Sequence, residues 1–361
     1  MTPVDLSTTV LHAVRRAVRE DALRAPVPAR VRVERTRPGG RGDYASAVAL
    51  QLAGPAGLGA REVAEILRDR LAGAPGVAGV EITGPGFLNF TLDASAGAAA
   101  HRDLVHRVRE EGERYGYGDA PAGHRLLLTH AREVRAAVTA DAVRRLLTAQ
   151  GAVVRVSCAG EPDPDWARLG VSAEAYGTPQ TPGEQRTPIR PVPAADTPAA
   201  LLTRLGPDAA RWGLLRAAGH DRAPLGPELI AQTEANALFR VRYAYARARA
   251  VLRGADRLGV AVAGPGEDID ATGAAGLLAL LDAHPAVLAA AARHRAPDRL
   301  ARHLEAVAGA FFDFHDAVPP LPVGDEKPSA AHRSRTAVAE AAGAVLAGGL
   351  SLLGVSAPEH L

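Results

Sequence analysis

The chain has 361 residues, which is enough for two or three domains with hydrophobic cores of their own. Its 42 basic and 40 acidic side chains leave a formal net charge of +2, which excludes a polycation, so nucleic-acid binding would require local basic patches. The single cysteine, Cys158, excludes an internal disulfide framework and favours a reducing, cytoplasmic location.

Membrane, metal and cofactor sites are not expected. No uninterrupted apolar run reaches the ~18 residues of a membrane span, and the amphipathic N-terminus lacks the apolar core of a signal peptide. The 12 histidines have no cysteine partner and no tight ligand spacing, which predicts no metal site. The Cys and His positions predict no nucleophilic catalysis either.

The first 118 residues predict a small α+β domain. Apolar spacing predicts a helix over residues 3–20, and alternation predicts a strand over 31–34. Helices are expected over 43–54, with Asp43 as the N-cap, and over 60–72. Residues 77–93 alternate on either side of a Gly-Pro-Gly turn, which predicts a β-hairpin, and a helix follows from about residue 98.

Two motifs in this domain resemble the N-terminal additional domain of arginyl-tRNA synthetases. Residues 42–46 read GDYAS, similar to that family's GDYAT, and residues 84–90 read GPGFLNF, similar to GPGFINF. In the family this domain binds the D-loop at the tRNA elbow. The resemblance implies that Phe87 stacks on an unpaired base, that Asn89 hydrogen-bonds it, and that Tyr44 belongs to the same tRNA-binding set. The alternative is that Phe87 is core and Asn89 closes the hairpin.

Residues 119–169 predict strand, helix and strand, and resemble the opening of the synthetase's Rossmann catalytic domain. There the family's HVGHLR motif begins the helix at the nucleotide site, whereas residues 130–135 here read HAREVR. His130 is kept, but Arg132 replaces the glycine and Glu133 the second histidine. The arginine is expected to block the adenine and the carboxylate to repel ATP. The sequence therefore predicts a degenerate former ATP site with no catalytic residues.

Residues 170–198 contain six prolines and predict a Pro-rich linker. In a complete synthetase the rest of the catalytic domain lies before this point, and here it is largely deleted. The family's KMSKR signature falls on residues 187–190, which read TPIR. The only lysine in the chain is Lys327, so the lysine that stabilises pyrophosphate is absent. These features predict that the protein is not an enzyme.

Residues 199–361 predict an all-α bundle, with helices over about 198–218, 227–253, 275–284, 285–294, 297–317 and 330–353. The stretch 236–253, NALFRVRYAYARARAVLR, has two apolar faces and two basic edges. One edge carries Arg242, Arg249 and Arg253 beside Tyr245, and the other carries Arg240 and Arg247 near Tyr243. Guanidinium groups beside aromatic rings suit phosphates and unpaired bases, although solvated arginines on a bundle helix are the alternative.

Three segments of this region resemble the anticodon-binding DALR domain of arginyl-tRNA synthetases. Residues 236–247 resemble NPVYYVQYAHAR, residues 205–212 (LGPDAARW) resemble VGVDAARF, and residues 345–361 resemble VLANGLDLLGVSAPERM. The resemblance implies anticodon-loop contacts by Tyr243, Ala244 and Arg247. Further candidate tRNA-binding residues are Arg240, Arg242 and Leu361.

The predicted fold class is an α+β N-terminal domain, a short Rossmann remnant and a C-terminal all-α helical bundle of the DALR type. We expect a catalytically inactive relative of arginyl-tRNA synthetase that binds tRNA, with arginine tRNA as the expected species and no cofactor. One alternative is an interaction module that binds a full-length synthetase or another protein without RNA. Another is an arginine-tRNA ligase, or an enzyme that uses arginyl-tRNA in another pathway.

Overall fold

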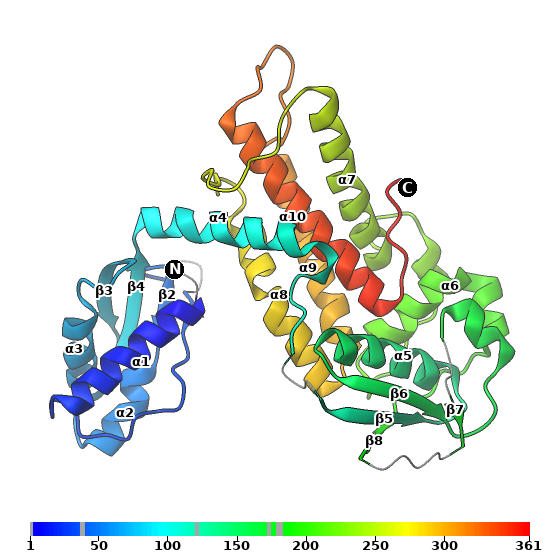
Figure 1. Ribbon diagram of the computed structural model, residues 1–361, viewed down its shortest axis with the longest axis horizontal. Helices are drawn as coiled ribbons and strands as arrows, with labels where there is room; N and C mark the ends of the chain where they lie inside the picture. Colours follow the sequence, from blue (N-terminus) through cyan, green and yellow to red (C-terminus); the bar gives the residue numbers. More distant parts are fainter. Residues whose placement is uncertain (1–2, 37–39, 120–122, 172–174, 178–182) are drawn as a thin grey trace. The chain divides into compact units, whose positions relative to one another are not determined.

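The protein divides into two compact units, Met1–Asp103 and Leu104–Leu361, each with its own hydrophobic core. The computed structural model in Figure 1 describes residues 3–36, 40–119, 123–171, 175–177 and 183–361. The fold is mixed α/β, with strands in the N-terminal unit, and a small parallel sheet and a helical bundle in the C-terminal unit. This agrees with the fold class predicted from the sequence.

The N-terminal unit is an antiparallel sheet in the order β1-β2-β4-β3, packed against helices. Helix α3 contacts β3 and β4, while α1 and α2 pack on α3. The predicted hairpin is present as β3 and β4. The elements are α1 (Pro3–Arg19), β1 (Glu34–Arg35), β2 (Tyr44–Ser46), α2 (Val48–Ala56), α3 (Ala60–Leu71), β3 (Val77–Thr83) and β4 (Phe87–Leu92).

The helix predicted to begin at Asp43 is wrong, because the chain forms β2 there before α2 starts. Ala47 precedes α2 and makes no side-chain cap. The Asp43 carboxylate accepts a hydrogen bond from the backbone of Leu92 at 2.8 Å, on the neighbouring strand β4. Gly42 has a φ of +71°, and a Cβ there would lie 2.7 Å from the Phe90 carbonyl oxygen, so the turn requires glycine.

The C-terminal unit begins within α4 (Ala94–Glu111) and contains a parallel sheet in the order β7-β6-β5-β8. Helix α5 packs on β5 and β6 and also contacts α6 and α8 of the bundle, so it lies between the sheet and the helices (Figure 1). The elements are β5 (Arg125–His130), α5 (Val134–Ala149), β6 (Val153–Cys158), a 3-10 helix (Pro164–Leu169), β7 (Ala175–Tyr176) and β8 (Gln185–Ile189).

The prediction of a linker over residues 170–198 is partly wrong, because this segment contributes β8 to the sheet. β8 pairs in parallel with β5, and Thr187 and Ile189 are buried. Pro188 lies within the strand, where a proline normally argues against pairing. It is tolerated because β8 is an edge strand, so one side of it needs no ladder hydrogen bonds. Residues 172–174 and 178–182 of the predicted linker lie outside the described residues.

The helical bundle is built around α10, which contacts α7, α8 and α9. Both α8 and α10 are long and apolar enough to pass a length-and-composition test for membrane spans. Within its most apolar window, α10 is 83% buried, which is typical of a core helix. The bundle elements are α6 (Pro198–Arg216), a 3-10 turn (Pro227–Ile230), α7 (Ala237–Arg257), α8 (Ala275–His294), α9 (Pro297–Ala317) and α10 (Ala330–Leu353).

Two predicted helix boundaries in the bundle are wrong. The helix expected over 227–253 is a separate 3-10 turn followed by α7, and the helices expected on either side of Pro285 are one helix, α8. Leu281 and Leu288 are buried on either side of this proline. Their packing offsets the missing backbone hydrogen bond, so the helix continues.

One hydrophobic cluster joins the parallel sheet to the bundle. It includes Leu128 of β5, Val138 of α5, Trp212 of α6 and Leu346 of α10. Residues 104–118, which the sequence analysis assigned to the first domain, also contribute to this cluster through Leu104, Val105, Val108 and Tyr115. The sheet therefore shares a core with the helices.

Candidate nucleic-acid interface and candidate nucleotide site

Helix α7 is fixed at its start by Asn236, which is buried. Its side-chain oxygen accepts hydrogen bonds from the backbone N–H groups of Leu238 (3.0 Å) and Phe239 (3.4 Å). Its amide nitrogen donates to the carbonyls of Leu229 (2.9 Å) and Ala231 (2.8 Å) in the preceding turn. This cap sets which faces of α7 point inward.

The inward face of α7 includes one residue that the sequence analysis placed at the anticodon. Ala244 is completely buried in the bundle core, next in sequence to the largely buried Tyr245. Burial raises the pKa of the Tyr245 hydroxyl. Because α7 is a regular helix whose core face includes Val241 and Ala248, Ala244 packs the bundle and its methyl group does not reach the surface.

One basic edge of α7 is neutralised by the protein itself. Arg242 pairs with Asp208 and donates from Nε to the carbonyl of Ser356 at 3.0 Å. Arg249 pairs with Glu359 at 2.9 Å, and Arg253 lies 3.7 Å from the same carboxylate.

The pKa of Asp208 reflects this pairing. Burial acts to raise it, but hydrogen bonds from Ser356 and the charge of Arg242 outweigh burial and lower it. Arg242, a predicted tRNA-binding residue, is therefore held in a structural ion pair between α6, α7 and the C-terminal segment.

The opposite edge of α7 carries Arg240, Tyr243 and Arg247 without such pairing. Tyr243 is 42% exposed, and its ring stacks on Phe239 (centroids 5.7 Å apart) and on Phe312 of α9 (5.6 Å). Arg240 and Arg247 form no ion pair with a carboxylate in the described part of the chain. This edge offers two cationic groups beside a ring held in a fixed orientation, which is the chemistry that binds phosphate and an unstacked base.

The same three side chains line a hollow of about 770 Å³ between α7 and α9. Arg247 donates from Nε to Nε2 of His315 at 3.2 Å. Asp313 and Asp316 line the hollow as well, so its charge is mixed. A second hollow of about 470 Å³ adjoins it, sharing Arg247, His315 and Asp316 and otherwise lined mostly by the apolar segment 319–323.

Leu361 is 58% exposed and lines a smaller hollow of about 260 Å³, together with Phe239 and Arg242. The sequence-based candidates for this site included neither Phe312 nor His315. Their contacts with Tyr243 and Arg247 come from a different helix, α9, so no spacing within α7 could reveal them.

In the N-terminal unit, the structure separates the three predicted contact residues. Phe87, at the start of β4, is 39% exposed. Asn89 is 6% exposed, and its amide donates to the Thr83 hydroxyl at 2.7 Å across the hairpin. Tyr44 is buried, with the Arg35 guanidinium 5.7 Å from its ring centroid. Phe87 is thus available to a base, while Asn89 and Tyr44 hold the sheet together.

The segment that the sequence predicts to be a degenerate nucleotide site lies at the start of α5. Glu133 is the N-cap of this helix, and its carboxylate accepts hydrogen bonds from the backbone N–H groups of Arg135 (2.9 Å), Ala136 (2.8 Å) and Ala194 (3.0 Å). A helix N-terminus binds phosphate through such N–H groups and through its dipole. Here a carboxylate of the chain already occupies them.

The other two residues of the predicted degenerate site also make local contacts. His130 is buried, its Nδ1 lies 2.8 Å from the Ala131 carbonyl oxygen, and burial lowers the pKa of its imidazole. Arg132 is exposed and donates from Nε to the carbonyl of Glu161 at 2.7 Å.

Two buried arginines attach α5 to the bundle, and no sequence pattern predicted a role for either. The Arg135 guanidinium donates to backbone carbonyls of Leu214, Val192, Asp221, Ala217 and Ala218. Burial lowers the pKa of its guanidinium. Because every donor is directed at a fixed carbonyl, the side chain locks the start of α5 in place.

Arg211 of α6 forms a fully buried ion pair with Asp141 of α5 at 2.7 Å and also donates to the carbonyl of Leu353 at the end of α10. Burial acts to raise the pKa of Asp141, but Arg211, Arg145 and Arg144 outweigh it and lower the pKa. This network joins the sheet layer to the bundle at both α6 and α10.

Comparison with known proteins identifies both ends of the chain. The model of the arginyl tRNA synthetase N terminal domain matches residues 5–92, and that of the DALR anticodon binding domain matches residues 241–361. The chain is 44% identical over 167 residues to the arginine–tRNA ligase of Renibacterium salmoninarum, covering 43% of this chain and 30% of the relative. It is 44% identical over 161 residues to that of Frankia alni, covering 42% and 28%.

Solved synthetase structures have a similar fold. The Thermus thermophilus arginyl-tRNA synthetase superposes with a TM-score of 0.66 at 13% identity, covering 100% of both chains. The Plasmodium falciparum enzyme superposes with a TM-score of 0.73 at 8% identity, covering 99% of both. The chain therefore combines a synthetase-type N-terminal domain with a DALR anticodon-binding domain. The matched part of the chain spans less than a third of the curated relatives' length.

Proposed function

We propose that this protein binds tRNA, with arginine tRNA as the preferred species, and does not attach arginine to it. The observation that carries the binding proposal is the edge of α7 formed by Arg240, Tyr243 and Arg247. The Tyr243 ring stacks on Phe239 and Phe312 and remains 42% exposed, and the two guanidinium groups of this edge form no ion pair with a carboxylate in the described ranges. Phe87 supplies a second exposed ring in the N-terminal unit.

The absence of aminoacylation is supported by the start of α5. A phosphate entering there meets the Glu133 carboxylate, which already accepts hydrogen bonds from backbone N–H groups that could receive an anion. These N–H groups lose their acceptor if the Glu133 carboxylate moves away, which costs free energy. A phosphate of ATP would therefore have to displace this carboxylate before it could bind to them. The chain also has no lysine before Lys327 to stabilise pyrophosphate.

Binding is tested with purified protein and an arginine tRNA transcript. Tyr243→Ala and Phe87→Ala should each weaken binding about 5- to 150-fold, because stacking on one base is worth about 1–3 kcal/mol. Tyr243→Phe keeps the ring and should bind like wild type. Tyr176→Ala removes a ring that is 67% exposed elsewhere, so it is the matched control and should change nothing.

Catalysis is tested separately, by arginine-dependent exchange of pyrophosphate into ATP. We expect no exchange above background with or without tRNA. Robust exchange would refute the non-catalytic part of the proposal and favour the ligase alternative. Failure to bind any tRNA at low ionic strength would refute the binding part, because electrostatic contacts with phosphates are strongest there.

A further inference from the structure

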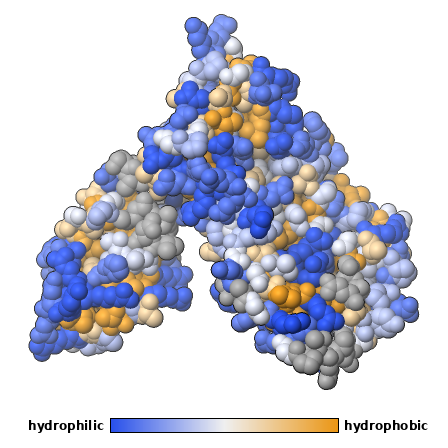
Figure 2. Space-filling model, viewed as in Figure 1, coloured by the Kyte–Doolittle hydropathy of each residue, from blue (hydrophilic) through white to orange (hydrophobic). Residues whose placement is uncertain are grey.

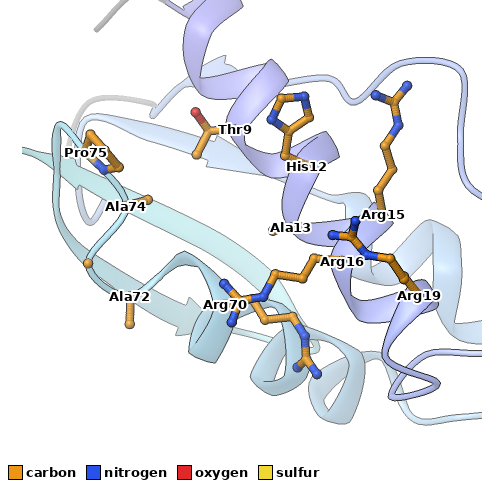
Figure 3. Close-up of a pocket in the computed structure, with 11 residues that line it drawn as sticks. Thr9, His12, Ala13, Arg15, Arg16, Arg19, Arg70, Ala72, Ala74 and Pro75 are labelled. Atoms are coloured by element: carbon orange, nitrogen blue, oxygen red, sulfur yellow. The ribbon is translucent and has the colours of Figure 1, made fainter.

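A second basic surface lies in the N-terminal unit, where no motif predicted a site. A hollow of about 680 Å³ is formed by the outer face of α1, the end of α3 and the turn that follows it (Figure 3). Four arginines line it: Arg15, Arg16, Arg19 and Arg70. Figure 2 shows hydrophilic side chains gathered over the C-terminal end of α1.

The arginines of α1 form an exposed stripe outside the hydrophobic core. Together with His12, the three arginines of α1 follow a spacing of three or four residues, which places them on one side of the helix. The opposite side, with Val10 and Val14, is completely buried in the unit's core. The arginine side chains are exposed, so hydrophobic burial does not explain their presence there.

The charge of this hollow is only partly neutralised. Arg16 pairs with Glu20 at 2.9 Å, and Arg70 pairs with the same carboxylate at 2.8 Å. Arg15 and Arg19 form no ion pair with a carboxylate in the ranges that the structure describes, and the residues lining the hollow include no acid. One carboxylate thus faces four guanidinium groups.

Part of the hollow is also preorganised. The Arg70 side chain is only 16% exposed, and it donates from Nη1 to the carbonyl of Ile66 at 2.9 Å while it holds Glu20. Its guanidinium is therefore fixed where α1 meets α3, and less entropy is lost when a ligand binds there.

We propose that this hollow binds phosphate groups of an RNA backbone, as a contact separate from the ring of Phe87. The proposal rests on the proposed function, since it assigns a further part of the tRNA-binding surface. Guanidinium groups match phosphate oxygens with paired, charge-assisted hydrogen bonds. They read no sequence, so this contact contributes affinity and orientation while Phe87 meets a base.

The position of the hollow suits an extended RNA contact. Gly86, beside Phe87, packs against Ala60 at the first residue of α3, where an added Cβ would lie 2.7 Å from the Ala60 carbonyl oxygen. The hollow lies at the other end of α3, beyond Leu71. A helix of 12 residues is about 18 Å long, so the stacked base and the phosphates would be several nucleotides apart or on opposite strands of a stem.

The test uses the full chain and an arginine tRNA transcript, with affinity measured across a range of salt concentrations. Arg15→Gln/Arg19→Gln removes two phosphate contacts and should reduce the slope of log affinity against log salt by about 1.4 to 1.8. At about 0.1 M salt this corresponds to an affinity loss of about 25- to 60-fold, and the loss should vanish towards 1 M.

Arg24→Gln/Arg32→Gln is the matched control. It removes the same charge from the same unit, but at exposed arginines that already pair with carboxylates outside the hollow. The control should keep the wild-type slope. Circular dichroism should show both variants folded, since all four side chains are exposed.

The outcomes separate this proposal from the function on which it rests. If wild type and Arg15→Gln/Arg19→Gln bind with the same slope while Phe87→Ala binds weakly, RNA binding stands and the phosphate hollow is refuted. Equal losses in the hollow variant and in the control would also refute it, because net charge alone would then explain the effect. If wild type binds no RNA at low salt, both proposals fail.

Discussion

Two buried histidines should make the stability of the C-terminal unit depend on pH. His284 of α8 and His303 of α9 stack with ring centroids 5.2 Å apart, and Tyr115 stacks on His284 at 6.0 Å. Nδ1 of His284 and Nε2 of His303 have no hydrogen-bond partner among the described residues. Burial, and then the charge of His303, lower the pKa of His284 to about 3, and burial lowers that of His303 to about 4.

The sign of the effect follows from proton binding in the two states. An unfolded histidine has a pKa of about 6.5, so between that value and the folded values the unfolded chain binds more protons. Stability is therefore complete above about pH 6.5 and falls as the pH drops towards the folded values. From about pH 7.5 to about pH 5, each histidine should cost ~2 kcal/mol of unfolding free energy, and the pair ~4 kcal/mol.

The assay is urea unfolding at several pH values in this window, followed by tryptophan fluorescence, since both tryptophans lie in this unit's core. His284→Leu/His303→Leu removes the titrating groups. Whatever the stability of this variant at neutral pH, the loss of its unfolding free energy between about pH 7.5 and about pH 5 should be about 4 kcal/mol smaller than in the wild type. His220→Leu/His360→Leu makes the same change at exposed positions and should keep the wild-type dependence. An unchanged pH dependence in the buried double variant would refute the reasoning.

Three further predictions concern the arginine and carboxylate contacts. Glu133→Ala should lower the free energy of unfolding by about 1–2 kcal/mol in a urea titration, because α5 loses its N-cap. Arg211→Met should cost about 3–5 kcal/mol by the same measurement, since it leaves the buried Asp141 without its closest partner. Arg247→Gln should weaken tRNA binding in a filter-binding assay and reduce the slope of log affinity against log salt by about 1. By contrast, Arg242→Gln should chiefly lower the thermal midpoint of unfolding, because the Arg242 charge is paired with Asp208 of the protein itself.

The sequence predicted regular elements wherever a single period extends over many residues. The hairpin of β3 and β4 and the helices α9 and α10 have nearly the predicted bounds. Elements that depend on a distant partner were missed. β2 exists because it pairs with β4, and β8 because it pairs with β5, more than 50 residues earlier. Local pattern cannot supply those partners, and the short strands carry too few residues to display a period.

The site shows the same limit in its side chains. Motif similarity pointed to Phe87, Tyr243 and Arg247, whose exposure suits contact with RNA, and equally to Asn89 and Ala244, which are buried. A sequence motif contains both the residues that contact RNA and the residues that support them. Similarity to the motif therefore does not show which of the two roles a residue has. The hydrogen-bond partners that reveal a structural role, such as the Thr83 hydroxyl for Asn89, are visible only in the folded chain.

Arg242 and Arg247 show this limit of sequence-based prediction most clearly, because they are the same type of residue on the same helix. Their difference lies in the other elements that reach each edge of α7. The C-terminal segment brings Ser356 and Glu359 to one edge, while α9 brings Phe312 and His315 to the other. The sequence shows how many arginines α7 carries. It does not show which of them remain available to a ligand, since that depends on which arginines are paired with carboxylates in the folded protein.

The start of α5 uses for its own structure backbone N–H groups of a kind that can bind phosphate. The first N–H groups of a helix need acceptors from outside the helix, which a bound phosphate, water or a side chain can supply. Where such groups are buried without an acceptor, they cost stability. Glu133 satisfies them permanently, and Arg135 and the Arg211–Asp141 pair fix the same helix to the bundle. Under the proposed function, these contacts give the parallel sheet a structural role. Its strands and α5 complete the hydrophobic core on which α6 and α10 pack, and so support the helix that presents Tyr243.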